Sequence, residues 1–100
     1  MSGTSIYVGV ARVQLHVPEA RSLKEKRRHT RSLIDRIRSR HQVLVIEAEH
    51  QNLYQRAGFV VCAVSTDGVD LESRLQRVSN TVEANWTGNV LEWDVEIIQL

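Results

Sequence analysis

The sequence predicts a single α+β domain in which strands and helices follow in the order β-α-β-β-α-β. Three observations carry this prediction. Apolar and polar residues alternate near both ends of the chain, an apolar run lies between Ala57 and Val64, and two further segments repeat apolar residues at helical spacing. This order is typical of the ferredoxin-like fold, in which two helices cover one face of a four-stranded antiparallel sheet. At 100 residues the chain has room for one core, so we expect residues 1–100 to form one domain.

The first strand is predicted over residues 7–17, where apolar and polar side chains alternate as far as Pro18. A capping box, with a serine at position 22 and a glutamate three residues later, starts the first helix at Ser22. That helix runs to about Arg40. Its apolar side consists of Leu23, Thr30, Leu33, Ile34 and Ile37.

Two strands joined by a polar hairpin are predicted next, over residues 42–49 and 57–64. The second is apolar on both faces, as is typical of a strand inside a sheet. Turn and cap residues at 65–68 then lead into a second helix that ends at 85–88. Its apolar residues are Leu71, Leu75, Val78 and Val82. The last strand, over 90–98, alternates Leu91, Trp93, Val95 and Ile97 with Glu92, Asp94 and Glu96.

Charge is unevenly distributed along a chain that has 13 basic and 12 acidic residues in all. Residues 21–40 hold nine bases and two acids, whereas residues 41–100 hold three bases and nine acids. The bases oppose helix formation, because cations near a helix N-terminus and like charges four residues apart each cost about 0.2–1 kcal/mol. Local stability therefore does not explain them, and we interpret them as a binding surface.

A phosphate backbone suits this basic helix as a partner. At about 100° per residue, most of the bases fall on one flank of the helix. The predicted nucleic-acid-binding residues are Lys24, Lys26, Arg27, Arg28, Arg31 and Arg38. The alternative is a solvated surface whose cations pair with the acidic last strand or with a partner subunit.

The polar hairpin is a second candidate site, formed by Glu47, Glu49, His50, Gln51 and Arg56. A histidine flanked by carboxylates can act as a general base or bind a metal, but no further ligands follow at a recognisable spacing. Structural roles are favoured, because turn residues of these types hydrogen-bond their own backbone. We therefore predict no catalytic residue, no metal and no cofactor, and keep hydrolysis only as an open alternative.

Membrane binding is not expected, because no apolar run approaches the roughly 20 residues that cross a bilayer. No basic stretch precedes the apolar segment near the N-terminus, so we place the protein in the cytoplasm. Two helices cover only one side of a sheet, whereas the predicted inner strands are apolar on both sides. We therefore expect a homo-oligomer, a homodimer through the open face. Its centre contains Val8 and Val10 and its rim contains Arg12, Glu92, Asp94 and Glu96.

Two segments resemble the YlxP family of small bacterial proteins, Arg21-Ser-Leu-Lys-Glu-Lys-Arg27 and Glu49-His-Gln-Asn-Leu-Tyr-Gln-Arg-Ala57. Members typically read Asp-His-Gln-Asp-Leu-Trp-Gln-Arg-Ala in the second segment, so this chain departs at Glu49, Asn52 and Tyr54. The resemblance covers nearly the whole chain and implies a ferredoxin-like fold. Genes of the family often lie beside those for translation initiation factor 2 and ribosome-binding factor A. The resemblance thereby implies a tie to ribosome assembly, without an established activity.

Together these observations favour a non-enzymatic accessory protein that binds RNA or the ribosome through its basic helix. The alternative is a homodimeric interaction module whose basic helix binds an acidic protein surface. The two differ in a measurable way, because binding to a phosphate backbone weakens steeply with salt.

Overall fold

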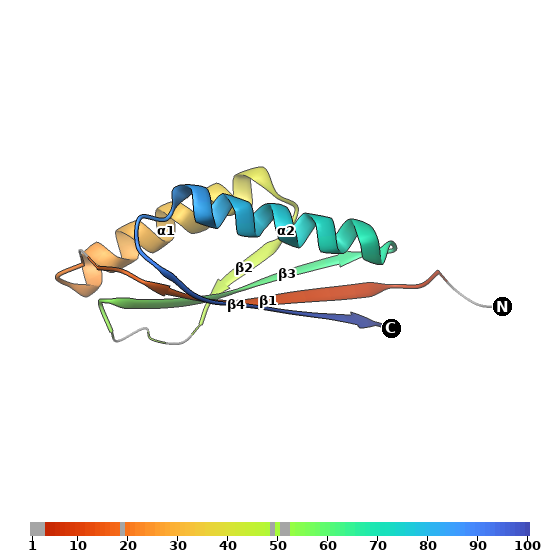
Figure 1. Ribbon diagram of the computed structural model, residues 1–100, viewed down its shortest axis with the longest axis horizontal. Coiled ribbons are helices and arrows are strands. Elements are labelled where there is room, and N and C mark those ends of the chain that lie inside the picture. Colours follow the sequence, from red (N-terminus) through yellow and green to blue (C-terminus); the bar gives the residue numbers. More distant parts are fainter. Residues whose placement is uncertain (1–3, 19, 49, 51–52) are drawn as a thin grey trace.

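The first strand of the chain lies inside the sheet, with later strands on both sides of it (Figure 1). The computed structural model describes residues 4–18, 20–48, 50 and 53–100. Neighbouring strands are antiparallel and follow the order β2-β3-β1-β4 across the sheet, so the predicted ferredoxin-like fold is confirmed. The elements are β1 (Tyr7–His16), α1 (Leu23–Arg40), β2 (Leu44–Glu47), β3 (Arg56–Ser65), α2 (Gly68–Asn85) and β4 (Val90–Gln99).

A serine caps the N-terminus of α1, and an aspartate caps the N-terminus of α2. The Ser22 hydroxyl accepts a hydrogen bond from the Glu25 N–H at 3.2 Å, as the predicted capping box requires. The Glu25 carboxylate, however, accepts from the N–H of Arg21 at 2.7 Å, so the reciprocal half of the box forms one residue earlier. At the start of α2 the Asp67 carboxylate accepts from the N–H of Val69 at 2.9 Å.

The core lies between the helices and the face of the sheet that they cover (Figure 1). α1 packs against β2 and β3, and α2 packs against β1, β3 and β4. Apolar side chains from both layers are buried there, and each contributes roughly 1.5–3 kcal/mol when fully removed from water. The largest fully buried residues are Phe59, Leu15, Ile37, Leu71, Leu75, Val13, Val61, Val78 and Val82.

The edge strands differ from the sequence prediction. β2 is shorter than predicted, and it pairs only over Leu44–Glu47 with the middle of β3. In β4, Leu91 is exposed rather than directed into the core. The register between β1 and β4 shifts at Gln14 and Leu15, so that Val90 instead of Leu91 lies opposite Leu15.

The two poles of the elongated molecule differ in content. At one pole β4 ends beside the start of β1, and the Leu100 N–H donates to the Ile6 carbonyl at 2.8 Å. The other pole carries the β1–α1, β2–β3 and α2–β4 connections (Figure 1). Of the described helices, neither is long and apolar enough to cross a bilayer.

Candidate functional site

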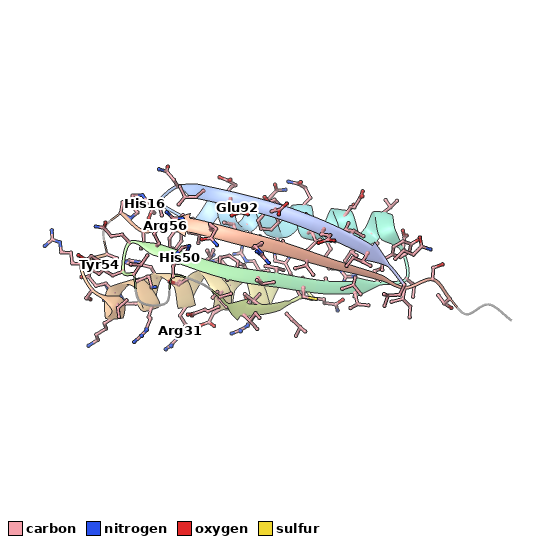
Figure 2. The ribbon with its side chains drawn as sticks, turned by 90° about the horizontal axis from the view of Figure 1, so that it is seen from below. His16, Arg31, His50, Tyr54, Arg56 and Glu92 are labelled. Atoms are coloured by element: carbon pink, nitrogen blue, oxygen red, sulfur yellow. The ribbon has the colours of Figure 1, made fainter. Side chains whose placement is uncertain are left out.

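Five cations form a ridge along one flank of α1, and all five are exposed. We call this surface the basic ridge; it consists of Lys24, Arg27, Arg28, Arg31 and Arg38. The Arg38 guanidinium donates to the Val45 carbonyl of β2 at 2.5 Å, so the ridge lies on the β2 side of the helix. Figure 2 shows Arg31 projecting on that side, away from β4. The ridge therefore faces solvent and not the second helix.

The cations of the basic ridge have no acidic partner within the part of the chain that the structure describes. No ion pair involves Lys24, Arg27, Arg28 or Arg31 there, although α2 has such a pair between Arg74 and Asp70 at 2.9 Å. Long side chains of the ridge instead surround a shallow hollow over α1, together with Ser22, Glu25, Ser32 and Asp35. An anion can therefore approach these cations without breaking an ion pair, although two carboxylates line the same hollow.

Lys26 does not belong to the basic ridge, and its predicted role in phosphate binding is wrong. Its side chain is only 5% exposed. Burial lowers the pKa of its ammonium group, an effect that the carboxylate of Glu47 partly opposes. Its Nζ donates to the backbone carbonyl of His50 at 2.6 Å. Lys26 therefore ties α1 to the hairpin, where it is out of reach of an RNA backbone.

Two further groups of α1 face α2 instead of the ridge side. Arg36 and His29 line a cavity of about 280 Å³ between α1 and the connection from α2 to β4. Trp86 forms part of the same cavity, and its indole N–H donates to the His16 carbonyl at 3.0 Å. The positive charge of Arg36 is thus directed toward the C-terminal end of α2, where that helix has no basic residue of its own.

The acids of β4 lie on the opposite face of the sheet from the helices. Glu92, Asp94 and Glu96 are in register with Gln14, Arg12 and Val10 of β1. These β1 residues alternate with the buried Ala11, Val13 and Leu15, whose side chains form the helix-covered core. Pairing between the basic helix and the acidic last strand within one chain, one of the two predicted alternatives, is therefore wrong.

The hairpin holds His50 by its backbone. Its φ angle is 52°, in the left-handed region that residues other than glycine rarely occupy. The His50 carbonyl accepts from the Leu53 N–H at 3.1 Å and also from the Lys26 ammonium described above. The main chain of His50 therefore closes the turn and anchors α1, and the structural role of its side chain stays a prediction.

The structure does not gather the predicted hairpin residues into one site. Glu49 and Gln51 lie outside the described residues. Glu47 is exposed at the end of β2, in register with Phe59 on the helix side of the sheet. Arg56 begins β3 on the open side, in register with His16. In the described part of the chain, no three histidine, cysteine, aspartate or glutamate side chains are grouped to hold a metal ion.

A polar cluster that the sequence did not reveal occupies the open face near the hairpin. His16, Arg56 and Glu92 lie at this end of the sheet in Figure 2. Gln14 of β1 lies at the same end, in register with Gly58 of β3 and with Glu92 of β4. A β-carbon at Gly58 would lie 2.4 Å from the Ala48 carbonyl and 3.2 Å from the Gln14 amide nitrogen. Only glycine fits there, so the hairpin backbone and Gln14 close tightly over β3. The cluster depends on strand register, which spacing along the chain does not give.

Comparison with known proteins places the chain in a family. A family model described as "Protein of unknown function (DUF503)" matches residues 8–95. The chain belongs to the DUF503 family. Uncharacterized protein YlxP of Bacillus subtilis (strain 168) is 35% identical over 71 residues, covering 71% of this chain and 77% of that protein. The resemblance to the YlxP family seen in two short segments is therefore confirmed.

Solved structures bear on the fold of this DUF503 protein. De novo designed protein Foldit4 matches with a TM-score of 0.52 at 14% sequence identity, over 95% of this chain and 96% of that one. At so low an identity the likeness shows the fold alone. The candidate site therefore has to be argued from the residues of this chain.

Proposed function

We propose that this DUF503 protein is a non-enzymatic accessory protein of the cytoplasm that binds RNA, free or within the ribosome. The basic ridge of α1 contacts the phosphate backbone. One observation carries the proposal: five exposed cations line one flank of a helix, and none of them has an acidic partner among the described residues. A solvated helix surface normally mixes charges of both signs, whereas this one is nearly all basic.

The geometry of the ridge suits a polyanion better than a small anion. From Lys24 to Arg38 the ridge extends about 21 Å along the helix axis, since each residue adds about 1.5 Å. Four of the cations line the shallow hollow over α1, and Arg38 extends the ridge beyond it, so a small anion would contact only part of the ridge. No aromatic residue lies among them to stack a base. We therefore expect affinity for the phosphate backbone with little dependence on RNA sequence.

The test measures RNA affinity as a function of salt. A labelled single-stranded RNA and a labelled RNA duplex are titrated by fluorescence anisotropy against the wild type and the combined K24E, R28E and R31E variant. The variant should bind both probes more weakly. Its slope of log affinity against log salt should fall by roughly 0.7 per lost contact for single strands and 0.9 for duplexes. An unchanged slope contradicts the proposal.

Two matched controls locate the effect. Arg77 is exposed on α2, so R77E changes the same charge outside the ridge and should leave the salt slope as in the wild type. Arg27 and Lys26 are sequence neighbours, but only Arg27 is exposed. R27M should therefore lower the salt slope by the amount expected for one lost phosphate contact, while K26M should leave the slope unchanged. Equal effects of R27M and K26M contradict the assignment of the ridge.

A pull-down from lysate with and without ribonuclease distinguishes RNA from an acidic protein surface as the partner. Recovery of ribosomal RNA and its loss after ribonuclease treatment supports the proposal. A protein retained by the basic ridge after ribonuclease treatment, combined with no affinity for either RNA probe, overturns it in favour of the protein-interaction module.

A further inference from the structure

The open face of the sheet carries a strip of apolar side chains that the fold leaves in solvent. We call it the apolar strip; it consists of Leu44, Ile46, Val60, Cys62, Val64 and Val10. Register places these residues side by side on β2, β3 and β1. Leu44 is 73% exposed, Ile46 is 62% exposed and Val64 is 55% exposed. Both helices lie on the other face (Figure 1), so the described residues of this chain do not cover the strip. Exposed apolar surface of this continuity marks an interaction site in soluble proteins.

Most of the charge on the same face lies on one side of the strip, apart from Arg56 at the start of β3. Glu92, Asp94 and Glu96 follow one another along the open side of β4, and Arg12 of β1 is in register with Asp94. By contrast, the open sides of β2 and β3 carry no charged side chain from position 44 to 48 or from 58 to 64. The face therefore has an apolar half on β2 and β3 and an acidic margin on β4.

We infer that a second copy of this chain covers the apolar strip, with β3 of one copy against β3 of the other. The charge pattern selects this arrangement among two-fold contacts. An axis perpendicular to the strands stacks β4 on β4 and brings acids against acids, which is unfavourable. An axis parallel to the strands and passing along β3 stacks β2 on β1 of the partner. The acidic margin of β4 then remains outside the contact. The apolar residues of β3 meet those of the partner's β3, Leu44 lies opposite the partner's Val10, and Ile46 lies opposite the partner's Arg12.

The available area approaches what such a contact needs. With strands about 4.8 Å apart and about 3.3 Å per residue, β1, β2 and β3 span a footprint of roughly 400 Å². Because side chains project from the sheet, the solvent-accessible area of this surface is larger than its flat footprint. A specific interface buries at least about 500 Å² on each partner, with an apolar centre and a polar rim. The inference is independent of RNA binding, because α1 lies on the opposite face of the sheet.

The test compares two exposed valines by sedimentation equilibrium. V64E places a carboxylate in the apolar strip, and V69E makes the same change on α2, where Val69 is 72% exposed. Both side chains are exposed in the single chain, so both variants should fold, which circular dichroism checks. We expect a wild-type dimer whose dissociation constant rises roughly a hundredfold or more in V64E, because the buried charge lacks a partner. V69E should behave as the wild type.

Cys62 gives a readout specific to this face, because it lies within the strip. Its reaction with a maleimide should slow as wild-type protein is concentrated through the dimerisation range, and should not slow in V64E. E96K, in the acidic margin, should change the dissociation constant by less than about tenfold. A wild type that stays monomeric at high micromolar concentration overturns the inference. A dimer without Cys62 protection overturns the choice of face, and a large effect of E96K overturns the choice of axis.

Discussion

The two helices of this protein have the same length and cover the same sheet, yet their exposed charges are arranged differently. α1 and α2 both span 18 residues, and both bury an apolar side against the strands. α2 has an acid in its first turn and an ion pair between Asp70 and Arg74 four residues later. α1 also has an acid in its first turn, Glu25, and bases in its last turn, Arg38 and Arg40. It differs in placing Lys24 near its N-terminus and in repeating like charges four residues apart, as in Arg27 and Arg31.

The difference distinguishes charged side chains that stabilise a helix from charged side chains that do not. Every charged feature of α2 named above stabilises a helix by the usual local effects. On α1, Lys24 near the N-terminus and the like charges four residues apart lose stability by the same effects, so folding does not account for them. A flank that keeps such charges and is almost uniformly basic is explained by a negatively charged partner. That reasoning supports the proposal made for the basic ridge.

The buried sides of the helices should be equivalent, and this is where the largest effect is expected. Leu33 of α1 and Leu75 of α2 are both almost fully buried. L33A and L75A should each lower the free energy of unfolding by about 2–5 kcal/mol, because each removes transfer energy and leaves a cavity. Urea denaturation at one fixed protein concentration measures both. A loss below about 1 kcal/mol in L33A alone would show that α1 is not held by packing as α2 is.

Exchanging first-turn charges should produce opposite and smaller changes in the two helices. K24E puts an acid near the N-terminus of α1 and four residues before Arg28, so the free energy of unfolding should rise by about 0.5–1 kcal/mol. D70K removes the acid and the Arg74 ion pair from α2, so it should fall by a similar amount. Thermal melting compares them. K24E should weaken RNA binding although it stabilises the fold. A lower free energy of unfolding in K24E than in the wild type would contradict the difference proposed between the two helices.

The smallest effect concerns the point where the helices share a polar contact. His41 caps α1, and its Nε2 lies 2.8 Å from the Thr81 hydroxyl of α2. Burial lowers the pKa of His41, and the charges of Arg77 and Arg40 lower it further. The folded state therefore binds this proton less readily than the unfolded chain, whose pKa is about 6.5. Stability that is complete above that value is lost as pH falls below it and through the folded-state pKa.

The matching variant is H41Q, which has no titrating group but can still donate to the hydroxyl. Urea denaturation between about pH 7 and pH 5 should show a smaller loss of stability in H41Q than in the wild type. Equal pH dependence of the two proteins would exclude His41 as the source of this sensitivity.

Much of the fold was predictable because its local signals agree. The N-cap at Ser22 and the spacing of Leu71, Leu75, Val78 and Val82 fix the helices, and alternation fixes the long strands. The burial of Lys26 also had a signal. Lys26 precedes Thr30 by four residues and Leu33 by seven, which places it on the apolar side of α1 and not on the ridge.

Other features were not predictable, because they depend on how distant segments meet. The register shift that exposes Leu91 arises from the pairing of β1 with β4. The left-handed backbone of His50 depends on a turn that Lys26 stabilises from another element. The cluster of His16, Arg56 and Glu92 forms only when three strands lie in register. None of these relations is encoded in residue spacing within a single element.

The central position of β1 has a consequence for how the chain reaches this fold. β1 is made first, but one of its two neighbours is β4, and Tyr7 pairs with Gln99 at the far end of the chain. Contacts so distant in sequence require almost the whole chain to close as one loop, which slows folding relative to a helical protein of this size. During synthesis, β1 can pair with β3 while its other edge stays open. The exposed hydrogen-bonding groups of that edge are a site for misassembly until β4 is made.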